Sequence, residues 1–128
     1  MQRRRGRGRG AGRGAAPAEA TEPADGSDPL TRDFGRAMRT VYERSRDEAN
    51  YPATHFLRML ADLGPLATAR RLLNAPAVSD GFAALWERGR LDLTVEALVA
   101  APRFAPLFTE KETDTARKRL GQFGYQAP

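Results

Sequence analysis

Arginine side chains offer the clearest chemistry at the beginning of this chain. Six of them lie within residues 1–14, which contain no acidic residue: Arg3, Arg4, Arg5, Arg7, Arg9 and Arg13. Guanidinium groups pair bidentately with phosphate and release its counterions, so this tail predicts weak, sequence-independent contact with RNA or DNA. The tail has no aromatic residue on which a base could stack. The alternative is a solubilising terminus that binds nothing.

A second group of charged residues lies near Gly89. Its members are Glu87, Arg88, Arg90, Asp92 and Glu96. Their three carboxylates could serve a small metal-dependent hydrolase, but such a cluster is more often an internal ion-pair network that holds a loop. Helix dipoles account for Arg88 near a helix C-terminus and Glu96 near a helix N-terminus. Dipoles do not explain why two arginines flank the glycine, so Arg88 and Arg90 are the predicted partner-binding residues.

The composition offers little to metal or cofactor chemistry. The chain has no cysteine, which excludes a disulfide, a zinc–thiolate site and a thiol nucleophile. His55 is the single histidine, and no carboxylate follows it at helical spacing. We therefore expect His55 to be a hydrogen-bonded residue at the edge of an apolar helix face. No glycine loop of the phosphate-binding kind is present, so no cofactor is predicted.

The charge of the chain divides it into segments. Residues 1–14 are basic, and residues 15–30 contain four acidic residues, no base and all three prolines that precede Leu30. Leu30 is the first leucine, isoleucine, valine or aromatic residue. Residues 1–30 therefore cannot bury enough apolar surface to offset the entropy of ordering, and we expect a disordered tail. A single helical domain is predicted over residues 31–128.

Apolar residues at helical spacing recur throughout residues 31–128, and no strand-like alternation competes with them. The first three helices are expected over Thr31–Ala49, over Pro52–Leu63 and from Pro65 to about Asn74. Three more begin at the cap residues Ser79, Thr94 and Thr109, the last of which forms a capping box with Glu112. The predicted fold is all-α, a compact set of about six short antiparallel helices.

The same spacing predicts burial. Phe82, Leu85 and Trp86 are expected to face inward from the fourth helix, and Leu63 from the second. Arg70 and Arg71 are expected to point outward. Three glycines carry backbone expectations. Gly64 is expected as a left-handed helix terminator, and Gly89 and Gly121 are expected as helix stops, Gly89 with a positive φ.

Several short motifs between Tyr51 and Leu120 occur in a characteristic order. They include Tyr51-Pro52-Ala53-Thr54, Ser79-Asp80-Gly81-Phe82, Leu91-Asp92-Leu93-Thr94 and Leu107-Phe108-Thr109. This order resembles a small, uncharacterised all-helical module of bacterial proteins, which stands alone or extends other domains at their C-terminus. The resemblance implies no catalytic residue, and it does not include the arginine-rich tail.

These observations favour a non-enzymatic helical interaction module that docks on an unidentified protein partner, with weak nucleic-acid contact through the tail. The alternative is an accessory protein of a bacterial defence or toxin-type system that acts only through protein–protein contact. The hydrolase is the least favoured. No apolar run is long enough for a membrane span, so no membrane contact is expected. No apolar segment follows the arginines as in a secretory signal, so the expected location is cytoplasmic.

Overall fold

The computed structural model describes residues 28–126 of the chain. The six tail arginines lie outside the described residues, as does most of the expected disordered tail. Contacts divide the chain into two units, residues 1–32 and 33–128, and the apolar core and the pocket described below belong to the second. Among residues 28–126, no helix has both the length and the apolar character needed to cross a membrane.

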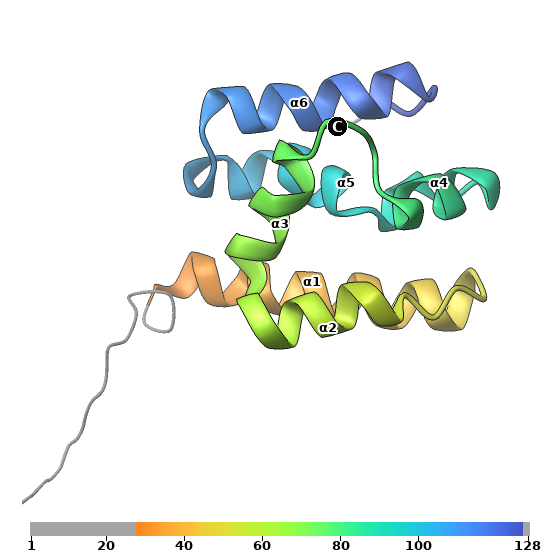
Figure 1. Cartoon of the computed structure of the whole chain (residues 1–128). Helices are drawn as coiled ribbons and strands as arrows, with labels where there is room; N and C mark the ends of the chain where they lie inside the picture. The colour runs from red at the N-terminus through yellow and green to blue at the C-terminus, as the bar shows by residue number, and fades with distance from the viewer. Residues whose placement is uncertain (1–27, 127–128) are drawn as a thin grey trace, which may run out of the picture. The chain divides into compact units, whose positions relative to one another are not determined.

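The described residues are helical and contain no strand, which confirms the all-α prediction (Figure 1). In chain order the elements are α1 (Pro29–Glu48), α2 (Thr54–Leu63), α3 (Pro65–Asn74), α4 (Asp80–Glu87), the 3-10 segment η3 (Leu91–Leu93), α5 (Val95–Ala100), the 3-10 segment η4 (Pro102–Leu107) and α6 (Glu110–Gln122). The three predicted caps are all present. Ser79, Thr94 and Thr109 accept hydrogen bonds from the backbone three residues later, and Glu112 completes the capping box.

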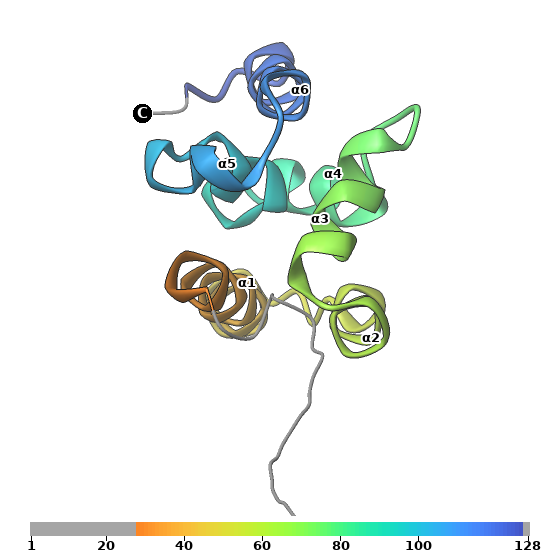
Figure 2. The ribbon, with the colours of Figure 1, turned by 90° about the vertical axis from the view of Figure 1, so that its left-hand side faces the viewer.

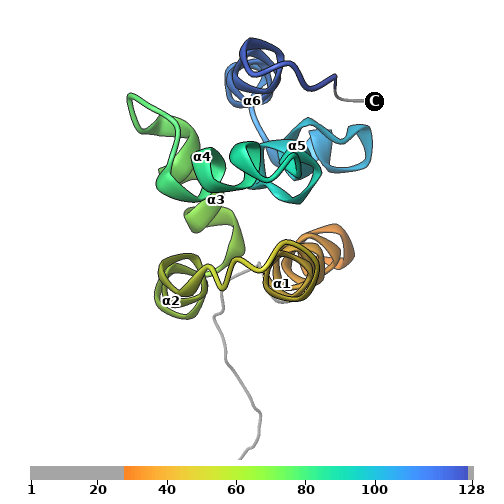
Figure 3. The same ribbon diagram turned by 90° about the vertical axis from the view of Figure 1, so that its right-hand side faces the viewer.

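The helices are not uniformly antiparallel. In the second unit α1 and α2 lie side by side, and α5 packs along α6 (Figures 2 and 3). Between these pairs, α3 runs across and contacts α2, α5 and α6. Pro65 begins α3 directly after Gly64, so the chain changes direction without an intervening loop. The tight corner at Gly64 therefore sets the crossing of α3.

The core forms along one face of α1. Phe34 and Met38 are fully buried, and the Phe34 ring meets Phe104 edge-on at 5.1 Å and Phe108 at 5.2 Å between ring centroids. Two aromatic residues of the proline-rich connector thus close over α1. Leu63, however, is 38% exposed and does not face inward. It is the last residue of α2, and the chain leaves that helix before another element can cover it.

Two helices end in the same hydrogen-bonded motif. At the end of α4, Gly89 has a φ of 70°, its N–H donates to Trp86, and the N–H of Arg90 donates to Leu85 at 2.8 Å. This is the Schellman arrangement, and it confirms the positive φ expected at Gly89. At the end of α6, Gly124 has a φ of 84° and the N–H of Tyr125 donates to Leu120 at 2.9 Å.

Two glycine expectations need correction. Gly121 does not stop α6, which continues to Gln122 and ends through Gly124 instead. Gly64 has a positive φ of 83°, but its ψ of 168° is extended and not left-handed helical. The reason is that α3 begins at the next residue, so Gly64 must redirect the chain outward instead of curling it back over α2.

Two side chains differ from their expected exposure. Trp86 is 47% exposed, because Phe82 and Leu85 occupy the narrow buried stripe of the short helix α4 and Trp86 lies at its edge. Arg70 does not point freely outward. It donates to the carbonyl oxygen of Leu107 at 2.8 Å and lies over the Phe108 ring, so it joins α3 to the end of η4.

Candidate functional site

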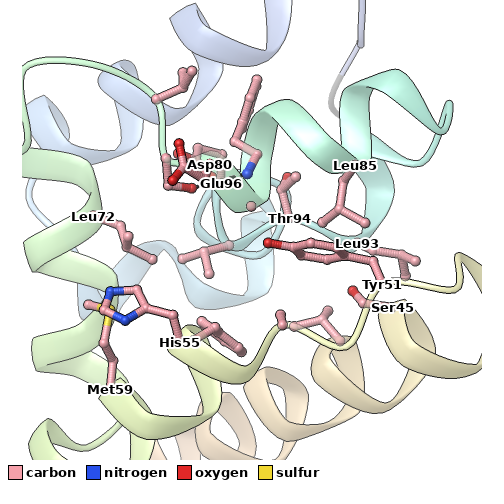
Figure 4. A pocket seen from close by; sticks show the side chains of 18 of the residues that line it. Ser45, Tyr51, His55, Met59, Leu72, Asp80, Leu85, Leu93, Thr94 and Glu96 are labelled. Carbon is pink, nitrogen blue, oxygen red and sulfur yellow. Dashed lines mark hydrogen bonds between the residues drawn. The ribbon is translucent and has the colours of Figure 1, made fainter.

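A pocket of about 660 Å³ lies in the part of the chain that the structure describes. Its walls come from α1, α2 and α4, from the connections that precede α2 and α4, from the start of α5, and from Leu72 of α3 and Leu93 of η3 (Figure 4). Much of the lining is apolar and well buried, as with Val41, Met59, Leu85 and Leu93. Its polar side chains include Ser45, Tyr51, His55, Asp80, Thr94 and Glu96.

The end of α1 places two hydroxyl groups on this pocket. The carbonyl oxygen of Ser45 accepts hydrogen bonds from the N–H groups of Ala49 at 3.2 Å and Tyr51 at 2.8 Å, and Asn50 between them has a φ of 54°. This turn brings Tyr51 back over the helix, and Figure 4 shows its hydroxyl directed toward the pocket. Neither the Ser45 nor the Tyr51 hydroxyl has a hydrogen-bond partner among the described residues. Both are therefore free to bind a guest.

Arg88, one of the two predicted partner-binding residues, contributes to holding Tyr51. Its guanidinium group lies 5.2 Å from the centroid of the Tyr51 ring and donates to the carbonyl oxygens of Ala49 at 3.0 Å and Ala84 at 2.9 Å. The carbonyl oxygen of Ala49, just past the end of α1, is satisfied in this way, and that of Ala84, which also accepts from the backbone N–H of Arg88, gains a second donor. Arg88 thus links these two helix ends, which explains its place beside Gly89.

Arg90, the other predicted partner-binding residue, belongs to an ion-pair network. It contacts Asp92 at 3.0 Å and Glu48 at 2.8 Å, while Arg44 contacts Glu48 at 2.8 Å. Hydrogen bonds from Arg44 and Arg90 lower the pKa of the Glu48 carboxyl to about 2, and Arg90 lowers the pKa of Asp92. This network fastens η3 to the end of α1, as the ion-pair interpretation of the corner predicts.

A separate buried pair involves Glu96, which is only 2% exposed. Nη1 of Arg119, itself 9% exposed, lies 3.4 Å from Oε2 of Glu96 and 2.9 Å from the carbonyl oxygen of Leu72. Nη2 of Arg119 donates to Ala75 at 2.6 Å. Burial raises the pKa of the Glu96 carboxyl although Arg119 opposes the shift.

Sequence reasoning missed Arg119. The helix dipole accounts for a carboxylate in the first turn of α5, but it does not account for its burial. One signal was present, since Arg119 follows the inward-facing Ala116 by three residues and so lies on the same side of α6. A charged residue on an apolar stripe requires a buried partner.

The structure does not gather the three carboxylates of the hydrolase interpretation. Glu87 is exposed, Asp92 pairs with Arg90, and Glu96 pairs with Arg119. Within residues 28–126, no group of three or more histidine, cysteine, aspartate or glutamate residues could hold a metal ion. His55 lines the pocket and is exposed, and its expected hydrogen bond stays a prediction.

An aromatic surface lies beside α4, apart from the pocket. Trp86 meets the ring of Phe123 edge-on at 5.4 Å, and Phe123 meets the buried ring of Phe82 at 5.1 Å. Phe123 follows α6 directly and folds back onto the body of the domain through its contact with Phe82. Trp86 is therefore supported from one side and open on the other.

Comparisons with protein-family models, curated proteins and solved structures gave no match. The functional interpretation therefore depends on the geometry of these two features, the pocket and the surface at Trp86.

Proposed function

We propose that this protein is a non-enzymatic helical interaction module that docks on a protein partner through the surface at Trp86. Its arginine-rich tail adds weak, sequence-independent contact with nucleic acid. The observation that carries the proposal is the exposure of Trp86, since among the described residues only Trp86 and Leu63 are large hydrophobic side chains that stay exposed.

The support beneath Trp86 suits a binding residue. Phe123 braces the indole ring and itself packs on Phe82, which belongs to the core. A braced aromatic side chain loses little conformational freedom on binding, and tryptophan is enriched among the residues that dominate protein interfaces. A partner that covers Trp86 would remove a large apolar surface from water at small entropic cost.

Arg88 and Arg90 have a secondary place in this proposal. Arg88 follows Trp86 closely in the chain and remains exposed, but its donors already serve Ala49 and Ala84. Arg90 already pairs with Asp92 and Glu48. An acidic partner group would compete with these existing contacts, so we expect the arginines to tune the docking and Trp86 to drive it.

A capture experiment with the full chain as bait tests the protein-docking part. Trp86→Ala should abolish or strongly weaken recovery of partners that the unmodified chain retains. Leu63→Ala is the matched control, because it truncates the other exposed large side chain, at the end of α2. Equal recovery by all three proteins would contradict docking through Trp86.

A binding titration with RNA and DNA tests the tail. The comparison is between the full chain and a variant with glutamine at the six tail arginines. Six phosphate contacts predict a slope of at most about −4 to −5 in the logarithm of the affinity against the logarithm of the salt concentration. The proposal for the tail fails if the variant binds as well as the unmodified chain.

A further inference from the structure

We propose that the pocket between α1, α2 and α4 is a binding site for a small neutral organic molecule. The ligand class is an apolar ring or chain that carries one hydrogen-bonding group, such as an amide or a phenol. This inference is independent of docking through Trp86, which does not line the pocket.

The size and walls of the pocket fit such a ligand. Its volume of about 660 Å³ lies within the range of roughly 300–1,000 Å³ typical of small-molecule sites. Met59, Leu85 and Leu93 are buried core residues that also line it. Because the same side chains belong to the packed core, the apolar walls are in place before any ligand arrives.

The hydroxyl groups of the pocket that have no hydrogen-bond partner determine which polar group a ligand must carry. Ser45 is 3% exposed, and neither its hydroxyl nor that of Tyr51 has a partner among the described residues. Thr94 lines the same pocket, but its hydroxyl donates to Leu91 at 2.6 Å and accepts from Ala97 at 3.2 Å. Two free hydroxyls therefore face a largely apolar space. A guest with an amide or hydroxyl group would satisfy them.

The charges around the pocket select against ions. No lysine or arginine lines it, so an anionic ligand would find no permanent cation and would face Asp80. Glu96 is already neutralised by Arg119, and Asp80 lies exposed in the first turn of α4, where the helix dipole offsets its charge. A cationic ligand would therefore lose its hydration in the pocket without gaining a strong ion pair there.

Gly81 provides a means to close the pocket. A Cβ atom at this position would lie 3.7 Å from the hydroxyl oxygens of Tyr51 and Ser79, which is ordinary van der Waals contact. The backbone of Gly81 has no positive φ, so it accepts a side chain without strain. A leucine here would extend from that point into the space near the Tyr51 hydroxyl.

An NMR titration of the full chain with three probes of similar size tests the inference. Benzamide is neutral, benzoate is anionic and benzylamine is cationic. The expected result is that benzamide shifts the methyl resonances of Met59 and Leu72, with benzoate and benzylamine at least about tenfold weaker. Binding of benzoate as tight as that of benzamide, or no shift with any probe, overturns the proposal.

Amino-acid substitutions in the pocket test whether benzamide binds there. Ser45→Ala and Tyr51→Phe each remove one hydroxyl with little change of shape and should weaken benzamide about two- to tenfold. Gly81→Leu should abolish its binding, whereas Trp86→Ala should leave it unchanged. Circular dichroism checks that each variant is folded. If Gly81→Leu is unfolded, the affinities of the two hydroxyl variants still test the proposal. Unchanged affinity in both hydroxyl variants overturns the assigned recognition.

Discussion

The guanidinium group of Arg119 lies 3.4 Å from the carboxylate of Glu96, with both side chains buried. The same group donates to the carbonyl oxygens of Leu72 and Ala75 at the end of α3. One side chain therefore ties α3, α5 and α6 together. Burial raises the pKa of Glu96, and a backbone hydrogen bond and Arg119 both oppose that shift by favouring the ionised carboxylate.

Arg119→Met should lower the free energy of unfolding by about 3–5 kcal/mol at neutral pH, because it leaves Glu96 charged, buried and unpaired. The loss should shrink in acid. A carboxyl whose folded pKa lies above its ordinary value of 4.5 destabilises the fold only when ionised, so the penalty is full above the folded pKa and absent below 4.5. Urea unfolding across this pH range measures the effect.

The double variant Arg119→Met with Glu96→Met is the control for the buried pair. It removes both charges together and should recover most of the stability lost in Arg119→Met alone. A double variant as unstable as the single one would show that the bonds to Leu72 and Ala75, and not the ion pair, account for the loss.

The pKa of Glu48 should change when either of its arginine partners is replaced. Arg44→Gln should raise the pKa of Glu48 from about 2 toward 4.5, and Arg90→Gln should raise it less, since the hydrogen bond from Arg44 is the larger cause. The lowered pKa means that the contribution of Glu48 to stability is present above 4.5 and is lost as the pH falls toward 2. Carboxyl carbon shifts report the titration, and an unmoved midpoint in both variants contradicts the network.

Trp86→Ala should cost only about 1–2 kcal/mol of unfolding free energy, since the side chain is half-exposed and loses chiefly its contact with Phe123. Phe82→Ala, one turn earlier in the same helix, should cost about 3–5 kcal/mol because that ring is buried. Chemical denaturation of both variants gives the comparison. Equal losses would mean that Trp86 belongs to the core.

Gly121→Ala should raise the free energy of unfolding by about 0.5–1 kcal/mol, as in an ordinary helix position. Gly121 lies inside α6, has no positive φ, and a Cβ atom there would meet nothing within 4 Å. Gly89→Ala is the matched comparison, with the same open space but a φ of 70°, and should lose about 1 kcal/mol. Changes of equal sign in urea unfolding would contradict the two assignments.

Thr68→Val should leave the unfolding free energy unchanged or raise it by about 1 kcal/mol. The hydroxyl of Thr68 is fully buried and has no hydrogen-bond partner among the described residues, so valine fills the same space without a desolvated polar atom. Thr94→Val provides the contrast, because that hydroxyl caps α5, and its loss should cost about 1–2 kcal/mol. Thermal or urea unfolding of the two variants distinguishes them.

The helix starts could be predicted because their signals are local. Ser79, Thr94 and Thr109 each accept a hydrogen bond from three residues ahead, so the segment itself contains both partners. The residues at which the helices end were harder to predict. Gly89 and Gly121 are both glycines in the last turns of apolar segments, yet only Gly89 adopts a positive φ.

The exposure of a side chain could be predicted at the centre of a helix's apolar stripe. At the edges of the stripe the prediction failed. Phe82 and Leu85 lie at the centre of the α4 stripe and are buried as expected. Trp86 lies at an edge, where its exposure depends on how far Phe123 reaches from the end of α6. Arg70 was expected to point outward because its neighbours in the sequence give no indication of its hydrogen bond to Leu107, which lies 37 residues away.

By itself the sequence determined an all-helical fold, its caps and its main buried stripe, since these depend on residues within one or two turns of each other. Only the tertiary structure decided the pocket, the exposure of Trp86 and the roles of the charged residues. Arg90 meets Glu48 across 42 residues, and Arg119 meets Glu96 across 23 and Leu72 across 47. No local spacing relates such partners, because the packing of the helices brings them together.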